Sequence, residues 1–395
     1  MSAEATMSDL KARDAEYVLG TYARFPVEIV SGKGAIAKGS DGKEYIDLGS
    51  GIGVTSFGYC DDEWVKAVTD QLSLVQHTSN LYYTEPCVNL AELLVKKTGL
   101  RKVFFSNSGA EANECAIKLA RKYAAEHRGE DCYTIVSLKN SFHGRTLTTL
   151  SATGQDHYHE LFQPLTPGFV SIEADCIEEL IALAASTKIA GIIVECVQGE
   201  GGVIPLDPDY LRAVDKFAKD HGIILIIDEV QTGNGRTGEL YAYMNYGITP
   251  DIVTTAKGLG GGLPIGACIA GEKVADTLGF GDHGSTYGGN PVCAAGAVSV
   301  IERLDDGFLA EVKEKAALVR SELEGAEGII SVSGLGLMIG IETVKPARDV
   351  VMKCMEMGVL CLTAKNKVRL LPPLNIPKDV LLRALGIIKA VCKEN

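Results

Sequence analysis

The stretch from Ile223 to Gly238 reads I-I-L-I-I-D-E-V-Q-T-G-N-G-R-T-G, and Thr254–Gly266 reads T-T-A-K-G-L-G-G-G-L-P-I-G. The run Ile223–Ile227 is apolar at every position, which is typical of a strand covered on both faces of a parallel sheet. Asp228 then stands at the carboxyl end of this strand, and Lys257 follows in a second loop of small residues. Because ligands of open α/β sheets bind at that edge, an acid and a lysine carried there by neighbouring strands are candidate catalytic groups.

Asp228 and Lys257 together suggest pyridoxal phosphate. A carboxylate in a dry site keeps a pyridine nitrogen protonated, and the ring then remains a strong electron sink. A lysine forms an imine with the aldehyde of the same ring, and burial lowers its pKa enough for it to act as a base. Taken singly, Asp228 is compatible with a helix N-cap and Lys257 with a solvated loop charge. Asp228 and Lys257 together, in loops rich in glycine, favour a site for pyridoxal phosphate.

The composition narrows the class of protein. The chain has 395 residues, 46% of them hydrophobic, which is enough for one large domain and a smaller one. It carries 38 basic and 51 acidic residues, a net charge of −13, and has no basic cluster, so nucleic acid and anionic membranes are poor candidate partners. Small anionic ligands remain possible, because local arginines bind them whatever the net charge.

The cysteines and the apolar runs indicate the compartment. Eleven cysteines lie between Cys60 and Cys392 without a C-x-x-C pair or metal-like spacing, which favours reduced thiols in a cytoplasmic protein and predicts no metal site. The first residues are polar, and no run approaches about 18 uninterrupted apolar residues, so we expect neither a signal peptide nor a membrane span.

The order of elements predicts an α/β fold whose large domain holds a mainly parallel, doubly wound sheet. Further buried strands and the helices between them are expected at 101–105, 109–126, 133–138, 189–195, 210–220 and 265–270. We expect the large domain to span 59–304. Residues 1–58 form an N-terminal arm with a small antiparallel sheet, ending in an irregular loop at Asp47–Gly58. Residues 305–395 form a small α+β domain with the arm, including one strand at Val359–Leu362.

Other motifs supply candidate binding groups. In S-N-S-G-A-E, the free backbone N–H groups of Gly109 and Ala110 at a helix start form a phosphate cradle, although an N-cap serine followed by glutamate is also an ordinary capping box. Two further glycine-rich stretches, Gly258–Gly262 and Gly334–Gly340, lack the G-x-G-x-x-G spacing between a strand and a helix, which argues against a dinucleotide.

Several side chains suit the faces and the charges of such a ligand. Phe142 is placed to stack on a flat cofactor, and Arg145 offers a fork for a substrate carboxylate. Glu200 lies beyond the carboxyl end of the strand at 189–195, and Arg369 precedes L-L-P-P-L in the small domain. The hydroxyls of a later loop and an aromatic residue of the arm are further candidates: Ser285, Thr286 and Tyr22.

Together these motifs resemble the class III aminotransferases of fold type I, over nearly the whole chain. The matching residues are S-N-S-G-A-E-A-N-E (106–114), F-H-G-R-T (142–146), Q-G-E-G-G (198–202), D-E-V-Q-T-G-N-G-R-T-G (228–238), T-T-A-K-G-L-G-G-G (254–262), G-S-T-Y-G-G-N-P (284–291) and V-R-L-L-P-P-L (368–374). The stretch Gly238–Asp251 is most similar to the subgroup that acts on N-acetylornithine.

The resemblance implies a role for each matching residue. Lys257 forms the imine with the cofactor and Asp228 pairs with its ring nitrogen. Gln231 binds the ring oxygen, while Phe142 and Val230 enclose the ring. The phosphate is bound by Ser108, Gly109, Ala110 and, from the other subunit of a homodimer, Thr286.

The resemblance also implies a substrate class of small amino and 2-oxo acids. Arg145 binds the distal α-carboxylate, Arg369 a carboxylate near the cofactor, and Glu200 pairs with Arg369 when it is free. Ser285 and Tyr22 complete the substrate side. The expected reaction is transfer of an amino group from N-acetylornithine to 2-oxoglutarate. Ornithine, 4-aminobutyrate and succinyl-diaminopimelate remain alternative donors, and a non-catalytic cofactor-binding protein is the alternative of a different class.

Overall fold

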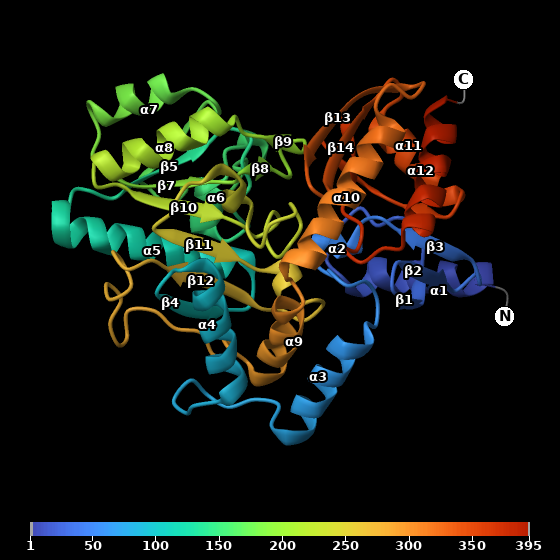
Figure 1. Ribbon diagram of the computed structural model, residues 1–395, viewed down its shortest axis with the longest axis horizontal. Helices are drawn as coiled ribbons and strands as arrows, with labels where there is room; N and C mark the ends of the chain where they lie inside the picture. Colours follow the sequence, from blue (N-terminus) through green and yellow to red (C-terminus); the bar gives the residue numbers. More distant parts are fainter. Residues whose placement is uncertain (1–2, 394–395) are drawn as a thin grey trace.

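A seven-stranded sheet occupies the centre of the larger part of the molecule (Figure 1). The computed structural model describes residues 3–393. The strand order is β4 (Lys102–Ser106), β12 (Gly266–Ala270), β11 (Ile252–Thr255), β10 (Ile224–Asp228), β7 (Ile189–Val194), β5 (Thr134–Leu138) and β6 (Phe169–Ile172). Only β12 runs antiparallel to its neighbours within this sheet. The predicted mainly parallel α/β fold is therefore confirmed.

Helices cover both faces of this sheet. Ile224 and Ile226 of β10 pack in a cluster with α5 (Gly109–Arg128), whereas Leu225 and Ile227 pack in the cluster that contains α8 (Pro208–Asp220). Because successive side chains of a strand point to opposite faces, α5 and α8 lie on opposite sides of the sheet. This double covering explains why the Ile223–Ile227 run is apolar throughout.

Three helices support the loop that follows β11. Helix α9 (Pro291–Glu302) packs against α3 (Asp62–Leu74) and α4 (Glu85–Thr98). Trp64 of α3 donates its indole N–H to the carbonyl of Gly260 at 3.0 Å. This hydrogen bond fixes the glycine-rich segment after Lys257 against α3.

The two ends of the chain come together in the smaller part of the molecule, blue and red in Figure 1. Strands β1 (Ile29–Lys33), β2 (Ile36–Gly39) and β3 (Glu44–Asp47) are antiparallel, and β15 (Val359–Leu360) pairs in parallel with β3. A second sheet has the order β13-β14-β17-β16. Its strands and the helices of this region are β13 (Ile329–Leu335), β14 (Met338–Thr343), β16 (Leu362–Ala364), β17 (Lys367–Leu370), α10 (Asp306–Leu323), α11 (Ala347–Glu356) and α12 (Lys378–Lys393).

Two local predictions were wrong. The single strand expected at Val359–Leu362 is two strands, β15 and β16, which belong to different sheets. The segment Asp47–Gly58 is not wholly irregular, because it contains the short helical turn α2 (Ser50–Gly53). Within that turn Gly51 and Ile52 have φ values of 62° and 66°, so the backbone is left-handed there.

The sequence patterns also missed several short elements, among them the three elements α6 (Leu147–Ala152), β6 and α7 (Ile177–Ala184). None of the three exceeds eight residues. A segment of that length shows too few turns of periodicity to be recognised.

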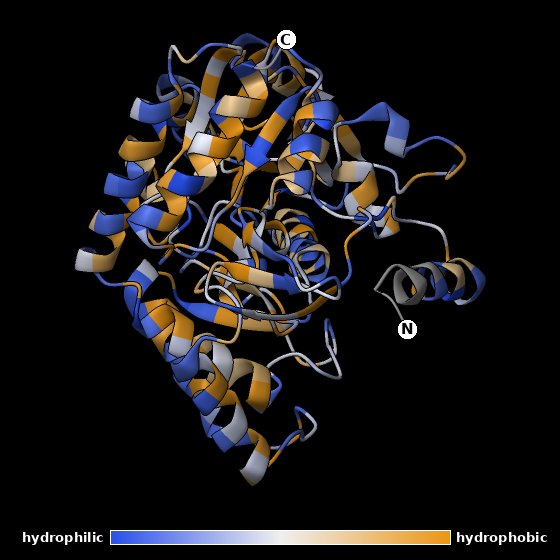
Figure 2. Ribbon diagram, turned by 90° about the vertical axis from the view of Figure 1, so that its right-hand side faces the viewer, coloured by the Kyte–Doolittle hydropathy of each residue, from blue (hydrophilic) through white to orange (hydrophobic). Residues whose placement is uncertain are grey.

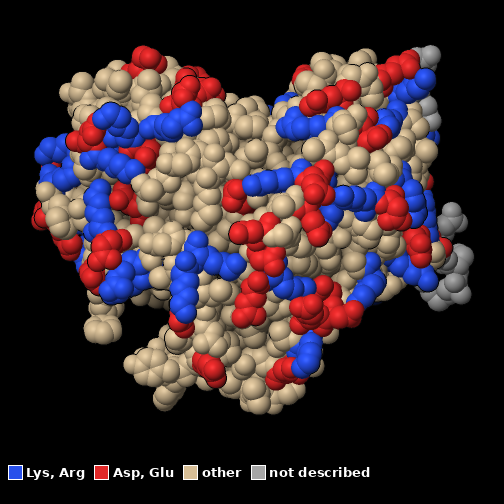
Figure 3. All heavy atoms as spheres, viewed as in Figure 1, with Lys and Arg blue, Asp and Glu red and all other residues tan. Residues whose placement is uncertain are grey.

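Two features concern the surface. In Figure 2 the helix nearest the N label, α1 (Ala3–Tyr17), stands away from the body of the molecule. The face drawn in Figure 3 carries acidic and basic side chains intermingled, with no continuous basic area. Among residues 3–393, no helix has both the length and the apolar character needed to cross a bilayer.

Candidate active site

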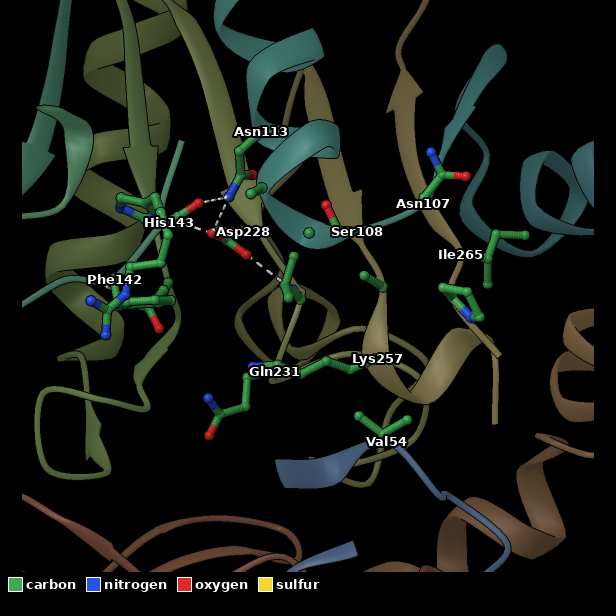
Figure 4. Close-up of a pocket in the computed structure, with 18 of the residues that line it drawn as sticks. Val54, Asn107, Ser108, Asn113, Phe142, His143, Asp228, Gln231, Lys257 and Ile265 are labelled. Atoms are coloured by element: carbon green, nitrogen blue, oxygen red, sulfur yellow. Dashed lines mark hydrogen bonds and ion pairs between the residues drawn. The ribbon is translucent and has the colours of Figure 1, made fainter. Parts of the chain in front are cut away.

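A cavity of about 480 Å³ opens beside the carboxyl ends of β10 and β11 (Figure 4). It contains Asp228, which ends β10, and Lys257, which begins the short 3-10 helix η3 (Lys257–Leu259) after β11. The lining residues are Val54, Asn107, Ser108, Gly109, Ala110, Asn113, Phe142, His143, Gly144, Arg145, Glu195, Asp228, Val230, Gln231, Ala256, Lys257, Gly262, Leu263, Pro264 and Ile265. The predicted acid and lysine therefore share one cavity.

Three donors hold the Asp228 carboxylate. Its Oδ2 accepts hydrogen bonds from Asn113 Nδ2 and His143 Nδ1, both at 2.8 Å, and its Oδ1 accepts the backbone N–H of Val230 at 3.0 Å. A carboxylate can only accept here, so His143 carries a proton on Nδ1. Asp228 is 3% exposed. Multiple donors compensate the cost of burying this charge.

Asn113 is itself fixed by the protein. Its Oδ1 accepts the hydroxyl of Thr254 on β11 at 2.6 Å, and its Nδ2 also donates to the carbonyl of His143 at 2.8 Å. The carboxylate is thus tied to α5, to β11 and to the loop after β5, as the dashed lines of Figure 4 show in part.

Lys257 reaches the cavity from a backbone of unusual conformation, with a φ of 45°. Its side chain has no hydrogen bond or ion pair within the described part of the chain. Removal from bulk water lowers the pKa of the Lys257 amine, while the nearby Glu200 opposes this effect. The lysine is therefore an uncommitted amine held by a strained turn, a feature typical of functional sites.

The start of α5 forms another wall of the cavity. Ser108 caps the helix by accepting the N–H of Glu111 at 3.2 Å. The N–H groups of Gly109 and Ala110 have no acceptor among residues 3–393. A Cβ on Gly109 would lie 2.5 Å from Cγ1 of Val230, so a side chain larger than hydrogen does not fit. Free N–H groups at a helix start are suited to a phosphate.

The loop after β5 brings Phe142 and Arg145 to the cavity. Phe142 is held by its backbone N–H, which donates to Glu195 Oε1 at 2.9 Å. Oε2 of the same carboxyl accepts the N–H of Gly199 at 3.2 Å. Burial raises the pKa of Glu195 to about 7. Glu195 thus links two of the loops that surround the cavity.

Glu200, Gln231 and Arg369 form a polar cluster beside the cavity. The Arg369 Nη1 lies 2.5 Å from Glu200 Oε1 and 3.1 Å from Gln231 Oε1. Burial acts to raise the pKa of the Glu200 carboxyl, but the charge and hydrogen bond of Arg369, the charge of Lys257 and the hydrogen bond from Gln231 together lower the pKa. Glu200 is therefore ionised, and its carboxylate forms an ion pair with Arg369.

Besides Glu200 and Arg369, which lie beside the cavity, three predicted site residues do not line it in this chain. Ser285 accepts hydrogen bonds from Asn107 Nδ2 at 3.2 Å and from the N–H of Gly288 at 2.9 Å. Thr286 and Tyr22 are exposed. Within residues 3–393, Ser285 reaches only the edge of the cavity through Asn107, and neither Thr286 nor Tyr22 lines it.

Sequence reasoning missed the roles of Asn113, His143 and Glu195. Asn113 is four residues after Gly109, so it faces the same side of α5, and this spacing was available as a signal. His143 lies in the quoted F-H-G-R-T motif, but its contact with Asp228 joins positions 85 residues apart. No local sequence pattern predicts a contact between residues so far apart in the chain.

Comparison with known proteins agrees with the geometry. The model of the family described as "Aminotransferase class-III" matches residues 19–392. The chain is 50% identical to an acetylornithine aminotransferase of Haemophilus ducreyi, covering 98% of this chain and 100% of the relative. It is 46% identical to one of Methanocaldococcus jannaschii, covering 96% and 97%.

A solved structure shows the same fold. The crystal structure of the ornithine aminotransferase from Toxoplasma gondii ME49 matches with a TM-score of 0.93 and 33% identity, covering 98% of this chain and 94% of that one. The chain belongs to the class III aminotransferases.

The close contact at Gly109 leads to a prediction. Gly109→Ala places a methyl group against Val230, and overpacking of this kind costs about 1–3 kcal/mol. We expect the Kd for pyridoxal phosphate, measured by titration of the apoprotein, to rise about tenfold. Gly386→Ala is the matched control, since a Cβ there meets open space on α12. Unchanged affinity in Gly109→Ala would mean that this wall does not contact the ligand.

Proposed function

We propose that this enzyme transfers the δ-amino group of N2-acetylornithine to 2-oxoglutarate, giving N-acetylglutamate 5-semialdehyde and glutamate. Two relatives named acetylornithine aminotransferase are 46 and 50% identical to the chain over nearly its full length. That similarity supports N-acetylornithine as the amino donor. The single structural observation that supports transamination is the uncommitted Lys257 amine in the same cavity as the buried Asp228 carboxylate.

The proposed cofactor is pyridoxal 5′-phosphate, and the cavity fits it. The N–H groups of Gly109 and Ala110, with Ser108, would hold the phosphate at the start of α5. Asp228 would pair with the ring nitrogen, Phe142 and Val230 would lie on the ring faces, and Gln231 would bind the ring oxygen. When bound, the cofactor supplies an aldehyde that exchanges amines and a ring that withdraws electrons from the substrate carbon.

The residues of the chain have separate tasks in this scheme. Asn113 and His143 orient the Asp228 carboxylate, because each donates to the same oxygen. Lys257 holds the cofactor, and its Nζ moves the proton at the substrate carbon. A lowered pKa suits this task, since a base must be unprotonated near neutral pH.

Two arginines would bind the carboxylates. The δ-amine of N-acetylornithine and the α-amine of glutamate place a carboxylate at different distances from the reacting carbon. We assign the distal carboxylate to Arg145 and the near carboxylate of glutamate to Arg369. Glu200 would pair with Arg369 during the first half-reaction, an arrangement supported by their 2.5 Å contact.

The proposal includes a homodimer that completes the site. Thr286 would bind the phosphate in the partner subunit, and Ser285 and Tyr22 would line the partner's substrate site. The exposure of Thr286 and Tyr22 supports this assignment. So does the number of large apolar side chains that one chain leaves at its surface, including Leu81, Tyr83 and Leu161.

We further propose a cytoplasmic location and a division of labour between domains. Most of the eleven cysteines are buried free thiols, which supports a reducing compartment. Residues 59–304 would hold the cofactor. The arm at 1–58 and the small domain at 305–395 would fit the substrate, since Arg369 comes from the latter.

The first test removes the lysine. Lys257→Ala should lower the turnover of N-acetylornithine with 2-oxoglutarate at least about a thousandfold, because it removes both the covalent attachment and the base. A coupled glutamate assay measures the rate. Lys188→Ala, which changes an exposed lysine paired with Asp131, should keep full activity. Near-normal turnover in Lys257→Ala would remove this lysine from the mechanism.

The second test separates the half-reactions. Arg369→Gln should lower the single-turnover kcat/KM for glutamate by about 30-fold, because a charge-assisted carboxylate contact is lost. The half-reaction with N-acetylornithine should fall less, since its carboxylate lies at the other arginine. Arg348→Gln, at an exposed position, serves as the control. Equal losses for both donors would contradict the two-arginine scheme.

A further inference from the structure

The guanidinium of Arg145 differs from that of Arg369, the other arginine assigned to a substrate carboxylate. It forms no hydrogen bond and no ion pair with any residue that the structure describes. Arg369, in contrast, is occupied by Glu200 and Gln231. An exposed arginine without a partner normally samples many rotamers, and it loses that freedom when it binds a carboxylate. Something else must orient Arg145 if it is to bind a substrate efficiently.

Two aromatic rings meet this need. The Arg145 Cζ lies 4.1 Å from the ring centroid of Tyr158 and 5.5 Å from that of Phe142. The two rings are 5.8 Å apart and at 70° to each other, an edge-to-face pair. A cation over a ring face is attracted by the ring quadrupole, and this attraction does not require a hydrogen bond from the guanidinium N–H groups. All N–H donors along the edge stay free for a carboxylate.

The position of Tyr158 is fixed by the loop that carries Phe142. Tyr158 ends the short 3-10 helix η1 (Asp156–Tyr158), and the preceding Gln155 is buried, with its Nε2 donating to the carbonyl of Ser141 at 3.0 Å. Backbone hydrogen bonding between Asn140 and Gly154 adds a second tie, at 2.7 Å. The ring is therefore attached to the wall of the site and does not belong to a free loop.

A carboxylate partner would hold Arg145 differently. It would occupy the N–H edge and compete with the substrate, as Glu200 does at Arg369. A ring that holds the face leaves the binding edge free at all times. This difference suits an arginine that must bind a carboxylate in both half-reactions.

We propose that Tyr158 is a positioning residue that holds Arg145 for the distal carboxylate, and so sets the preference for acidic amino donors over amines that lack this carboxylate. The inference rests on the proposed function, because it takes the distal carboxylate as the ligand of Arg145. The proposed role belongs to the aromatic ring of Tyr158, and its hydroxyl group takes no part in it.

The test compares two donors that differ only in the carboxylate. N-acetylputrescine is N-acetylornithine with its α-carboxylate replaced by hydrogen. Single-turnover kcat/KM is measured for both with the wild type, Tyr158→Leu and Tyr158→Phe. We expect Tyr158→Leu to lose about tenfold with N-acetylornithine, mainly through KM, and less than about twofold with N-acetylputrescine. Tyr158→Phe should keep the wild-type preference, because it keeps the ring.

A second readout does not depend on turnover. The Kd of glutarate, a dicarboxylate without an amine, is measured by calorimetry and should rise about tenfold in Tyr158→Leu but not in Tyr158→Phe. Equal losses for both donors in Tyr158→Leu, or a Tyr158→Phe variant as impaired as Tyr158→Leu, would overturn the inference.

Failure of the proposed function gives a different result. If the wild type does not use N-acetylornithine, the comparison is made with the ω-amino acid that it uses best and the decarboxylated form of that acid. Tyr158→Leu must then narrow the difference between those two donors, or the inference is wrong.

Discussion

The hydrogen-bonded Asp228 carboxylate is the interaction on which the rest of the site depends. A charge that is 3% exposed is tolerated only with several donors, and these come from α5, from the loop after β5 and from the turn after β10. Each of these segments also forms part of the cavity wall. The same contacts that stabilise the buried acid therefore place the helix start, the loop that carries Phe142 and the turn after β10 around one cavity.

The two arginines differ in the way they are held, and this difference organises the substrate side. Arg369 is held at its edge by a carboxylate and an amide, so a ligand must displace them. Arg145 lies over the rings of Tyr158 and Phe142 and forms no hydrogen bond within residues 3–393, so its N–H groups are free. In the proposed scheme the chemistry lies at Asp228 and Lys257, whereas the choice of substrate lies with the two arginines, which are held by more adjustable contacts.

The sequence predicted the sheet and the central pair well, for a physical reason. A strand covered on both faces must be apolar throughout, and the residue at its carboxyl end must lie at the ligand edge, so Ile223–Ile227 placed Asp228 directly. The helix start at Gly109 was equally readable, because capping and small residues are local signals. These predictions needed no knowledge of distant contacts.

Other features could not be predicted, because they depend on contacts between distant parts of the chain. The His143 contact with Asp228 and the Tyr158 contact with Arg145 join loops whose approach only the folded sheet determines. The division of Val359–Leu362 between two sheets depends on β3, more than 300 residues earlier in the chain. The sequence of the antiparallel strand β12 resembles that of any other buried strand. Burial determines the composition of a strand, whereas its direction in the sheet does not.

The most direct test of the whole account compares specificity constants for four amino donors with 2-oxoglutarate as acceptor: N-acetylornithine, ornithine, 4-aminobutyrate and succinyl-diaminopimelate. The account predicts the highest kcat/KM for N-acetylornithine. A higher value for any of the other three would contradict the proposed function.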